Sequence, residues 1–170
     1  MLDVILDSPL SPWLQHDIDA TDHIVISSRI RLARNFDGVL FTNRNDMSSL
    51  EKVNSISRSL LKPLKDVDGH QYSNINLEQL SKRDRAILVE KHLMSPALEE
   101  KLPYRNLVVS DDASIVIMVN EEDHLRIQSM VYGLKLEVAY ERVLKIDKAI
   151  EAKYPYAFDE RFGYLPACPT

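Results

Sequence analysis

The sequence has little glycine, a single cysteine and no long apolar run, and each shortage excludes a class of protein. Four glycines occur among 170 residues, and neither a GxxxxGK[ST] nor a GxGxxG phosphate-binding loop is present. The single cysteine, Cys168, excludes a disulfide within the chain and the usual zinc-binding patterns. No apolar run approaches the roughly 20 residues of a membrane span, and the first residues lack the basic region of a signal peptide. We therefore expect a cytoplasmic protein with no membrane partner.

Excess positive charge is also missing. The formal net charge is −5, so a general nucleic-acid-binding surface is not expected, and any phosphate site must be a local basic face on an acidic molecule. Hydrophobic residues make up 45% of the chain and charged residues 28%, as in ordinary globular proteins. A chain of 170 residues is long enough for one domain with a sizeable core.

The segment IVIMVNEEDHLR, residues 115–126, combines a buried strand with a charge cluster. Ile115–Val119 is an apolar run that predicts a strand buried on both faces. If the chain stays extended beyond it, Glu122, His124 and Arg126 share one face, because alternate side chains of a strand point the same way. The alternative is a polar loop in which Arg126 pairs with a neighbouring acid. A dedicated metal site is not expected, because the glycine turn typical of hard-cation loops is missing here.

A second strand is predicted over Ile24–Arg34. Its alternation places Arg29 and Arg31 on one face and apolar residues on the other. Two arginines at this spacing form a rigid array of donors suited to phosphate oxygens. The alternative is an edge strand that uses charge to prevent pairing with other chains. Three arginines within six residues, with no acid among them, favour an anion site.

The remaining pattern predicts an α+β fold in which an antiparallel sheet carries the arginine and glutamate face and helices pack behind it. The expected helices are Asp46–Leu61, ended by Pro63 and Asp66–Gly69, then Lys82–His92 with a Ser81/Asp84 capping box, and Leu136–Lys153. Leu136, Ala139, Val143, Ile146 and Ile150 form the apolar stripe of the last helix. Further expected elements are a turn at Ser95–Leu98, strands at Leu107–Val109 and Phe162–Ala167, and a hairpin at Met130–Gly133. Residues 1–22 are expected to form an arm that packs through Trp13.

Two residues have open interpretations from the sequence alone. His92 ends its predicted helix, where the helix dipole favours a cation, so it can be an ordinary helix-terminal histidine. Cys168 can be an inert small hydrophobic residue, or a thiolate beside the arginine-rich face.

Four segments together resemble the guanidino-phosphotransferase family, which contains the phosphagen kinases. They are SSRIRLAR at 27–34, KHLMSP at 91–96, NEEDHLRIQSM at 120–130 and GYLPACPT at 163–170. They occur in the family's order, and NEEDHLR ahead of CPT is a highly specific combination. The resemblance spans about residues 13–170 and is strongest to the bacterial McsB-type protein-arginine kinases. It implies a guanidino-kinase catalytic domain with a glutamine-synthetase-like fold.

The resemblance also implies roles for individual residues. Ser27, Ser28, Arg29, Ile30 and Arg31 match the first part of the ATP-phosphate clamp, with the two arginines as phosphate ligands. His92 matches a histidine on the adenosine side of the nucleotide, and Arg126 matches a further phosphate arginine. Glu122 matches the carboxylate that orients the substrate guanidinium and accepts its proton, and Cys168 matches the reactive cysteine beside that guanidinium. ATP and Mg²⁺ are the implied cofactors, with the metal held mainly by phosphates and water.

The expected function is phosphorylation of arginine side chains in proteins. The implied partners are a repressor of stress genes, misfolded proteins bound for a Clp-type protease, an activator protein and a second copy of the chain. Residues 23–170 match only the first part of the family's catalytic domain, so we expect a truncated chain. Two alternatives remain: a kinase for a small free guanidino compound, and an incomplete fragment that serves as a nucleotide-binding or interaction module.

Overall fold

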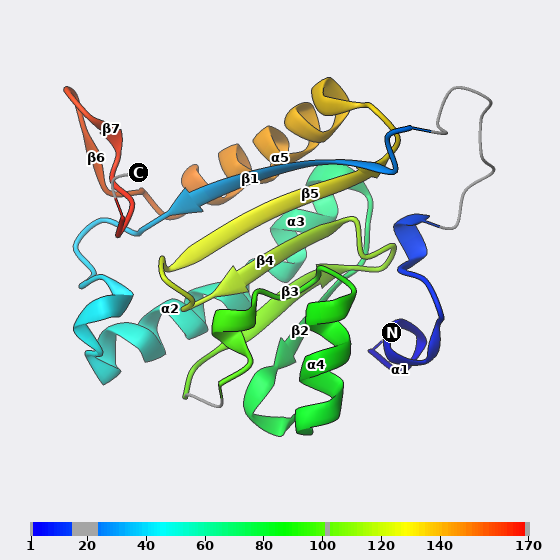
Figure 1. Ribbon diagram of the computed structural model, residues 1–170. Coiled ribbons are helices and arrows are strands. Elements are labelled where there is room, and N and C mark those ends of the chain that lie inside the picture. The colour runs from blue at the N-terminus through cyan, green and yellow to red at the C-terminus, as the bar shows by residue number, and fades with distance from the viewer. Residues whose placement is uncertain (1, 15–23, 101–102, 169–170) are drawn as a thin grey trace.

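A five-stranded antiparallel sheet forms the centre of the molecule, with the strand order β1-β5-β4-β3-β2 (Figure 1). The computed structural model describes residues 2–14, 24–100 and 103–168. The strands are β1 Ser27–Arg34, β2 Tyr72–Asn76, β3 Asn106–Ser110, β4 Ile115–Val119 and β5 Leu125–Tyr132. The apolar residues of β4 are buried in the middle of this sheet, as their sequence predicts. The expected α+β fold with an antiparallel sheet is confirmed.

Three helices cover one face of the sheet: α2 Met47–Ser59, α3 Leu61–Asp68 and α5 Leu136–Glu151 (Figure 1). Their buried side chains share one core with residues of β1, β3, β4 and β5. Three residues of the predicted stripe of α5, Val143, Ile146 and Ile150, lie in this core, and Ala139 and Asp147 are buried as well. Leu136, the fifth, is half exposed at the first position of α5, so its assignment to the core is wrong.

The opposite face is covered by α1 Leu2–Asp7, α4 Lys82–Glu90 and short 3₁₀ turns that include Pro12–Leu14 and Pro96–Leu98. These elements enclose a second core, in which Trp13 is buried. The N-terminal arm therefore packs through its tryptophan as predicted, although residues 15–22 lie outside the described part. Helices were expected only on the face of the sheet that α2, α3 and α5 cover. The elements that cover the other face, on which Arg29 and Arg31 lie, were not expected.

The helix boundaries follow capping chemistry. Asp46 caps α2 by accepting a hydrogen bond from the Ser49 N–H at 2.8 Å, and Ser81 and Asp84 form the predicted capping box of α4. Pro63, predicted to end the first helix, instead lies in the first turn of α3. A proline is tolerated there because N–H groups in the first turn lack helical partners. Gly69 ends α3 in the left-handed conformation, with φ 79°.

Three strand predictions need correction. β5 occupies the region predicted as a hairpin at Met130–Gly133, and the turn that reverses the chain lies instead at residues 120–124. β2 has no counterpart among the predicted elements. The tail predicted as a strand over Phe162–Ala167 pairs only at Gly163–Tyr164, which forms β7 against β6 Phe158–Asp159. Beyond β7, the Leu165 N–H still donates to the Ala157 carbonyl at 2.9 Å, but the Ala167 N–H donates to Asp123 Oδ1 instead of extending the pairing.

Within the described residues, no helix is both long and apolar enough to cross a membrane.

Candidate active site

An open cavity of about 350 Å³ lies where β1 and β5 meet the last described residues of the chain. Four residues with predicted roles line it: Arg31, Glu122, Arg126 and Cys168. They come from β1, the β4–β5 loop, β5 and the segment after β7. The structure therefore brings together groups from distant parts of the sequence, of which Arg31 and Cys168 are 137 positions apart.

The β4–β5 loop presents its three acids in different environments. Asn120, which opens the loop, has a left-handed backbone with φ 56°. Its side-chain amide donates hydrogen bonds to the carbonyl oxygens of Leu50 at 2.9 Å and Tyr104 at 2.8 Å. The side chain of Glu122 is 50% exposed, whereas those of Glu121 and Asp123 are 3% exposed. The loop therefore exposes one carboxylate, that of Glu122, and buries the two beside it.

Arg126 lies among these carboxylates. Its Nη1 is 2.6 Å from Glu121 Oε2, and its Nη2 is 3.0 Å from Glu122 Oε2 and 3.8 Å from Asp123 Oδ2. The Glu121 contact is an ion pair rather than an aligned hydrogen bond. Arg126 is therefore oriented by protein groups, as the loop interpretation of the sequence predicted.

Arg29 and Arg31 lie on one face of β1, opposite Met130 and Gln128 of β5. Among the described residues, neither arginine forms an ion pair. Burial, followed by the nearby charge of Arg31, lowers the pKa of Arg29. Two uncompensated guanidinium groups this close repel each other, and an anion between them would relieve that repulsion.

The other predicted residues of β1 divide between its two faces. Ser27 is exposed on the arginine face. Ser28 faces the opposite way, where its hydroxyl donates to the Gly133 carbonyl and accepts from the Lys135 N–H, both at 2.8 Å. Ile30 packs against the core on that same side. Only the backbone of Ser28 and Ile30 is available to a ligand on the arginine face.

His92 is exposed just beyond the C-terminus of α4, with φ 59°. Its carbonyl oxygen accepts a hydrogen bond from Gln128 Nε2 at 2.8 Å, and Gln128 lies directly opposite Arg31 in the sheet. His92 and Ser27 line a second cavity of about 560 Å³ with apolar residues of the N-terminal arm and α4. Of the predicted nucleotide residues, Ser27, Arg29 and Arg31 thus lie along one face of β1, with His92 at the Ser27 end.

His124 does not share a face with Glu122 and Arg126, contrary to the extended-chain prediction. The turn at 120–124 breaks the alternation and buries the imidazole completely. Its Nδ1 accepts from the Phe36 N–H at 3.0 Å and its Nε2 donates to the Leu40 carbonyl at 2.8 Å. Burial lowers the pKa of His124. The histidine is structural in this arrangement.

Sequence reasoning missed the residues that support the cavity. Arg34, the third arginine of β1, pairs with Asp147 at 2.8 Å and stacks on Tyr164 at 3.9 Å, so it holds α5 and β7. Asn35 donates to Asp123 Oδ1 at 2.7 Å inside the protein. The alternation of β1 places Arg34 on the other face of the strand from Arg29 and Arg31, so the sequence could have predicted that Arg34 points into the protein. No comparable pattern in the sequence marks Asn35.

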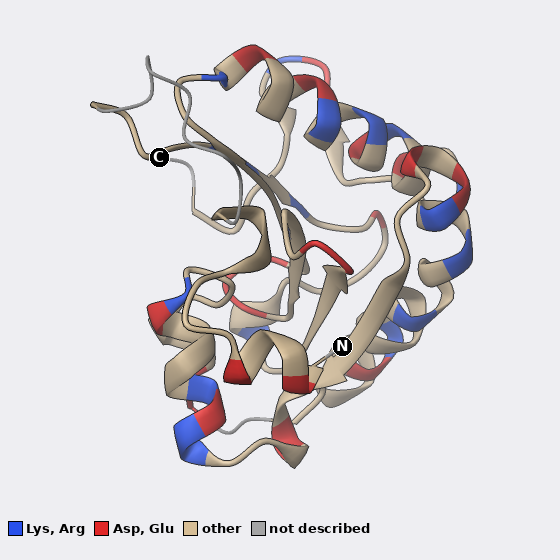
Figure 2. Ribbon diagram, turned by 90° about the vertical axis from the view of Figure 1, so that its right-hand side faces the viewer, with Lys and Arg blue, Asp and Glu red and all other residues tan. Residues whose placement is uncertain are grey.

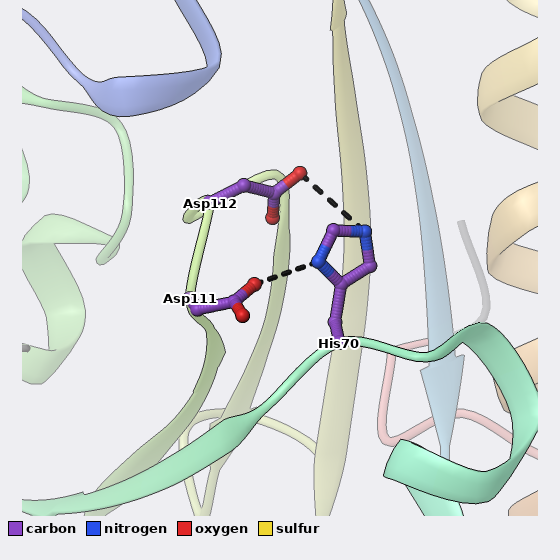
Figure 3. A group of neighbouring side chains, drawn as sticks. All are labelled: His70, Asp111 and Asp112. Carbon is purple, nitrogen blue, oxygen red and sulfur yellow. Dashed lines mark hydrogen bonds and ion pairs between the residues drawn. The ribbon is translucent and has the colours of Figure 1, made fainter.

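A separate cluster of possible metal ligands contains His70, Asp111 and Asp112 (Figure 3). His70 Nδ1 lies 2.6 Å from Asp111, and its Nε2 lies 3.8 Å from Asp112. Arg142 of α5 reaches Asp112 at 3.4 Å and donates to Ser114 at 2.7 Å. This guanidinium compensates the carboxylates, so the cluster is an ion-pair network that joins α5 to the sheet.

Charges of both signs alternate along the helices (Figure 2). The sequences KRDRAILVE of α4 and LEVAYERVLKIDKAIE of α5 show the same mixture. No broad surface of one sign arises from these two helices. The arginine pair of β1 is therefore a local basic feature, as the net charge required.

Comparisons with known proteins identify the family of the chain. A model of the family described as ATP:guanido phosphotransferase, C-terminal catalytic domain, matches residues 52–170. A protein-arginine kinase of Syntrophomonas wolfei is 43% identical, covering 93% of this chain and 44% of that protein. A protein-arginine kinase of Shouchella clausii is 38% identical, and the match covers 99% of this chain and 47% of that protein. The chain thus spans about half the length of the curated relatives it matches.

Solved structures show the same fold. The duplicated taurocyamine kinase of Schistosoma mansoni, with bound transition-state-analogue components, superposes with a TM-score of 0.73 at 27% identity, covering 99% of this chain and 24% of that one. A lombricine kinase superposes with a TM-score of 0.71 at 22% identity, and the match covers 99% of this chain and 48% of that one. The fold, the clustered residues and the family match lead to one conclusion: the chain belongs to the ATP:guanido phosphotransferase family.

Proposed function

We propose that this chain contributes the first part of the catalytic domain of an ATP-dependent protein-arginine kinase. The observation that carries the proposal is the cavity that gathers Arg31, Glu122, Arg126 and Cys168. A phosphoryl transfer to a guanidino group needs positive charge around the phosphate and a carboxylate at the acceptor. The cavity offers both within one space.

The phosphate end of the proposed site is the arginine face of β1. Arg29 and Arg31 project from a sheet, so they can receive phosphate oxygens with little reorganisation. Arg126 lies beyond them, opposite Ala33 in the sheet. Arginine forks bind phosphate oxygens in pairs, which fixes the orientation of the group as well as its position.

The adenosine end is proposed to lie at His92 and Ser27. Ser27 precedes Arg31 by four residues, a distance of about 13 Å along a strand. The larger cavity at this end has apolar walls, including Trp13 and Leu14, that suit the ring of a base. A nucleotide lying along β1 would thus direct its terminal phosphate towards Glu122.

At the acceptor end, the Glu122 carboxylate would hold the substrate guanidinium and orient one nitrogen towards the γ-phosphorus. That nitrogen attacks, the bond to the bridging oxygen of ADP breaks, and the nitrogen's proton passes to Glu122. A carboxylate is needed because the guanidinium has a pKa above 12 and its lone pairs are delocalised. Cys168, on the same cavity wall, would favour the cationic substrate as a thiolate.

Mg²⁺ fits this site as a companion of the nucleotide. The exposed carboxylate of the cavity, Glu122, is already 3.0 Å from Arg126, which leaves the phosphates and water as the main ligands. When bound, the metal spreads the negative charge of the phosphates. The arginines then orient the terminal phosphate.

The choice of a protein-borne arginine rests on the relatives. The proteins named protein-arginine kinase are 38–43% identical to this chain, whereas the taurocyamine and lombricine kinases are 22–27% identical. Finer proposals follow the same resemblance: a stress-gene repressor and misfolded proteins destined for a Clp-type protease as substrates, an activator protein, a homodimer and a cytoplasmic location. Residues 1–22 are proposed to be an arm beside the catalytic part, 23–170.

One observation favours a second function. The chain spans about half the length of its curated relatives, so its site can require residues that it does not contain. In that case the chain binds the nucleotide without transferring phosphate. A kinase for a small free guanidino compound is the remaining alternative, supported by the solved neighbours.

The deciding experiment is intact-mass measurement of an arginine-rich protein incubated with the 170-residue chain and MgATP. The same substrate with lysine at every arginine position is the control, and free arginine is offered separately. A gain of acid-labile phosphoryl groups on the arginine-containing protein alone supports the proposal. Phosphorylation of free arginine alone supports the small-substrate alternative. Nucleotide binding by calorimetry without any transfer supports the incomplete site.

A further inference from the structure

The two buried carboxylates beside Glu122 have no part in the proposed transfer. Glu121 and Asp123 each have side chains that are 3% exposed, so neither can meet a protein substrate directly. A buried carboxylate is costly unless it is paired or hydrogen-bonded. The partners of these two carboxylates therefore indicate what they do.

Asp123 holds the segment that carries Cys168. Its Oδ1 accepts a hydrogen bond from the Ala167 N–H at 2.6 Å, immediately before the cysteine. The same oxygen accepts from Asn35 Nδ2 at 2.7 Å, and this amide also donates to the Leu165 carbonyl at 3.0 Å. The segment is thus attached at two points, on either side of Pro166. Charge-assisted bonds of this kind are among the stronger ones in proteins.

Glu121 holds a different part of the site. Its Oε2 lies 2.6 Å from Arg126 Nη1, and its Oε1 accepts from the Ser95 hydroxyl at 2.5 Å. Ser95 precedes the 3₁₀ turn on the arginine side of the sheet. Both of these contacts of Glu121 are with residues outside the Cys168 segment.

We propose that Asp123 and Glu121 are positioning residues with different principal targets, although Asp123 also lies 3.8 Å from Arg126, against 2.6 Å for Glu121. Asp123 holds Cys168 beside Glu122, and Glu121 aims the guanidinium of Arg126. The inference rests on the proposed function for the catalytic meaning of these targets. The positioning itself follows from the contacts and can be measured without nucleotide or transfer.

The first test is alkylation of Cys168 by iodoacetamide, followed by intact mass over a range of pH. The chain has one cysteine, so the signal is unambiguous. Charged groups face the thiol cavity from three elements: Arg31 and Arg34 of β1, Arg126 of β5, and Glu122 and Asp123 of the loop. Asp123→Ala should move the alkylation rate to that of the urea-unfolded chain.

Two variants make this result specific. The alkylation rate of Asp123→Asn should remain closer to that of the unchanged chain than to that of the unfolded chain. The reason is that both hydrogen bonds to Asp123 end on Oδ1, and the amide oxygen of an asparagine can accept both. Asp46→Ala is the matched control, because the Asp46 carboxylate also accepts a backbone N–H but does not line the cavity; it should leave the alkylation rate within about two-fold. The proposal is overturned if Asp123→Ala keeps the native rate, or if Asp46→Ala changes the rate as much.

A second measurement keeps the test valid if Asp123→Ala does not fold. In the unchanged chain, hydrogen exchange of the Ala167 amide should be at least about tenfold slower than that of the Arg161 amide. Both amides donate to aspartates, but the partner of Arg161, Asp159, lies in an exposed contact. Equal exchange at the two positions would show that Asp123 does not hold the segment.

The other half of the proposal is tested by calorimetry with MgATP. Glu121→Ala should weaken binding by about tenfold, because Arg126 loses its buried partner. Asp123→Asn should change it by less than about two-fold. If Glu121→Ala binds as tightly as the unchanged chain, the role of Glu121 is wrong. If the unchanged chain binds no nucleotide, the proposed function fails, whereas the alkylation and exchange results still decide the role of Asp123.

Discussion

At the scale of the residue, exposure separates Glu122 from the acids on either side of it. Glu122 reaches the cavity and keeps Arg126 at 3.0 Å, while Glu121 and Asp123 are enclosed by protein groups. In our proposal, a carboxylate therefore contacts the substrate at one position and positions other residues at the two positions beside it. Their sequence alone, EED, does not distinguish these roles.

Glu122→Gln tests the contact role, because it keeps the size of the side chain and removes its charge and basicity. We expect phosphoryl transfer to arginine to fall by at least about a hundredfold, while nucleotide affinity changes little. Transfer is measured by intact mass and affinity by calorimetry, in this chain or in a fusion to the remaining length of its Syntrophomonas wolfei relative. Near-normal turnover in the variant would show that Glu122 is not the base.

His124 makes a prediction about pH. Burial lowers its pKa from the usual 6.5, so below about pH 6.5 the unfolded chain binds a proton that the folded chain excludes. The stability contributed by neutral His124 is therefore present above about pH 6.5 and is lost as the pH falls. Between pH 7 and 5.5, the free energy of unfolding should decrease by up to about 1.4 kcal/mol per pH unit more steeply in the unchanged chain than in His124→Gln.

Urea denaturation at several pH values checks this prediction. At pH 7 the variant should already be less stable by about 1–3 kcal/mol, because the hydrogen bonds to Phe36 and Leu40 are disturbed. Parallel stability curves for the two proteins would contradict the assignment of His124 as a buried neutral group.

At the scale of the element, the β4–β5 loop depends on Asn120. Its left-handed backbone and its two amide hydrogen bonds orient the acids that follow. We expect Asn120→Ala to lower the free energy of unfolding by about 2–4 kcal/mol, through the lost bonds and the unfavourable φ. Asn120→Gly should recover about 1 kcal/mol of this, because glycine accepts a positive φ. Urea denaturation of both variants provides the measurement, and equal losses would show that backbone strain plays no part.

Periodicity predicted the elements whose faces differ clearly in polarity. β1, β4, α4 and α5 were placed within a few residues of their observed bounds. β5 was missed because Arg126, Gln128 and Ser129 interrupt its apolar pattern, although all three lie inside the sheet. Gln128 is accommodated there through its bond to the His92 carbonyl, a contact between distant segments. α3 was missed because a proline in the first turn was taken as a stop.

At the scale of the whole molecule, an acidic chain carries the proposed nucleotide site as a small basic face. If MgATP binds there, it stabilises the folded state by mass action, by about 2.7 kcal/mol at a hundred times the dissociation constant. The midpoint of thermal unfolding should then rise by roughly 5–10 °C. Arg31→Ala should remove most of this shift, whereas Arg58→Ala, an exposed arginine of α2, should leave it unchanged. Equal shifts in the two variants would place the nucleotide elsewhere.

The sequence by itself determined the α+β class, the central strand, the arginine alternation of β1 and the family, since these depend on local pattern and on short motifs. It also identified Glu122, Arg126 and Cys168 as candidates. Only the tertiary structure decided that these three share a cavity, that His124 is buried, and that Asp123 and Asn35 secure the cysteine segment. The physical reason is the distance along the chain over which each kind of information acts. Periodicity reflects the surroundings of residues that are near neighbours in the sequence. A site is made of contacts between residues about a hundred positions apart, and only tertiary packing brings such residues together.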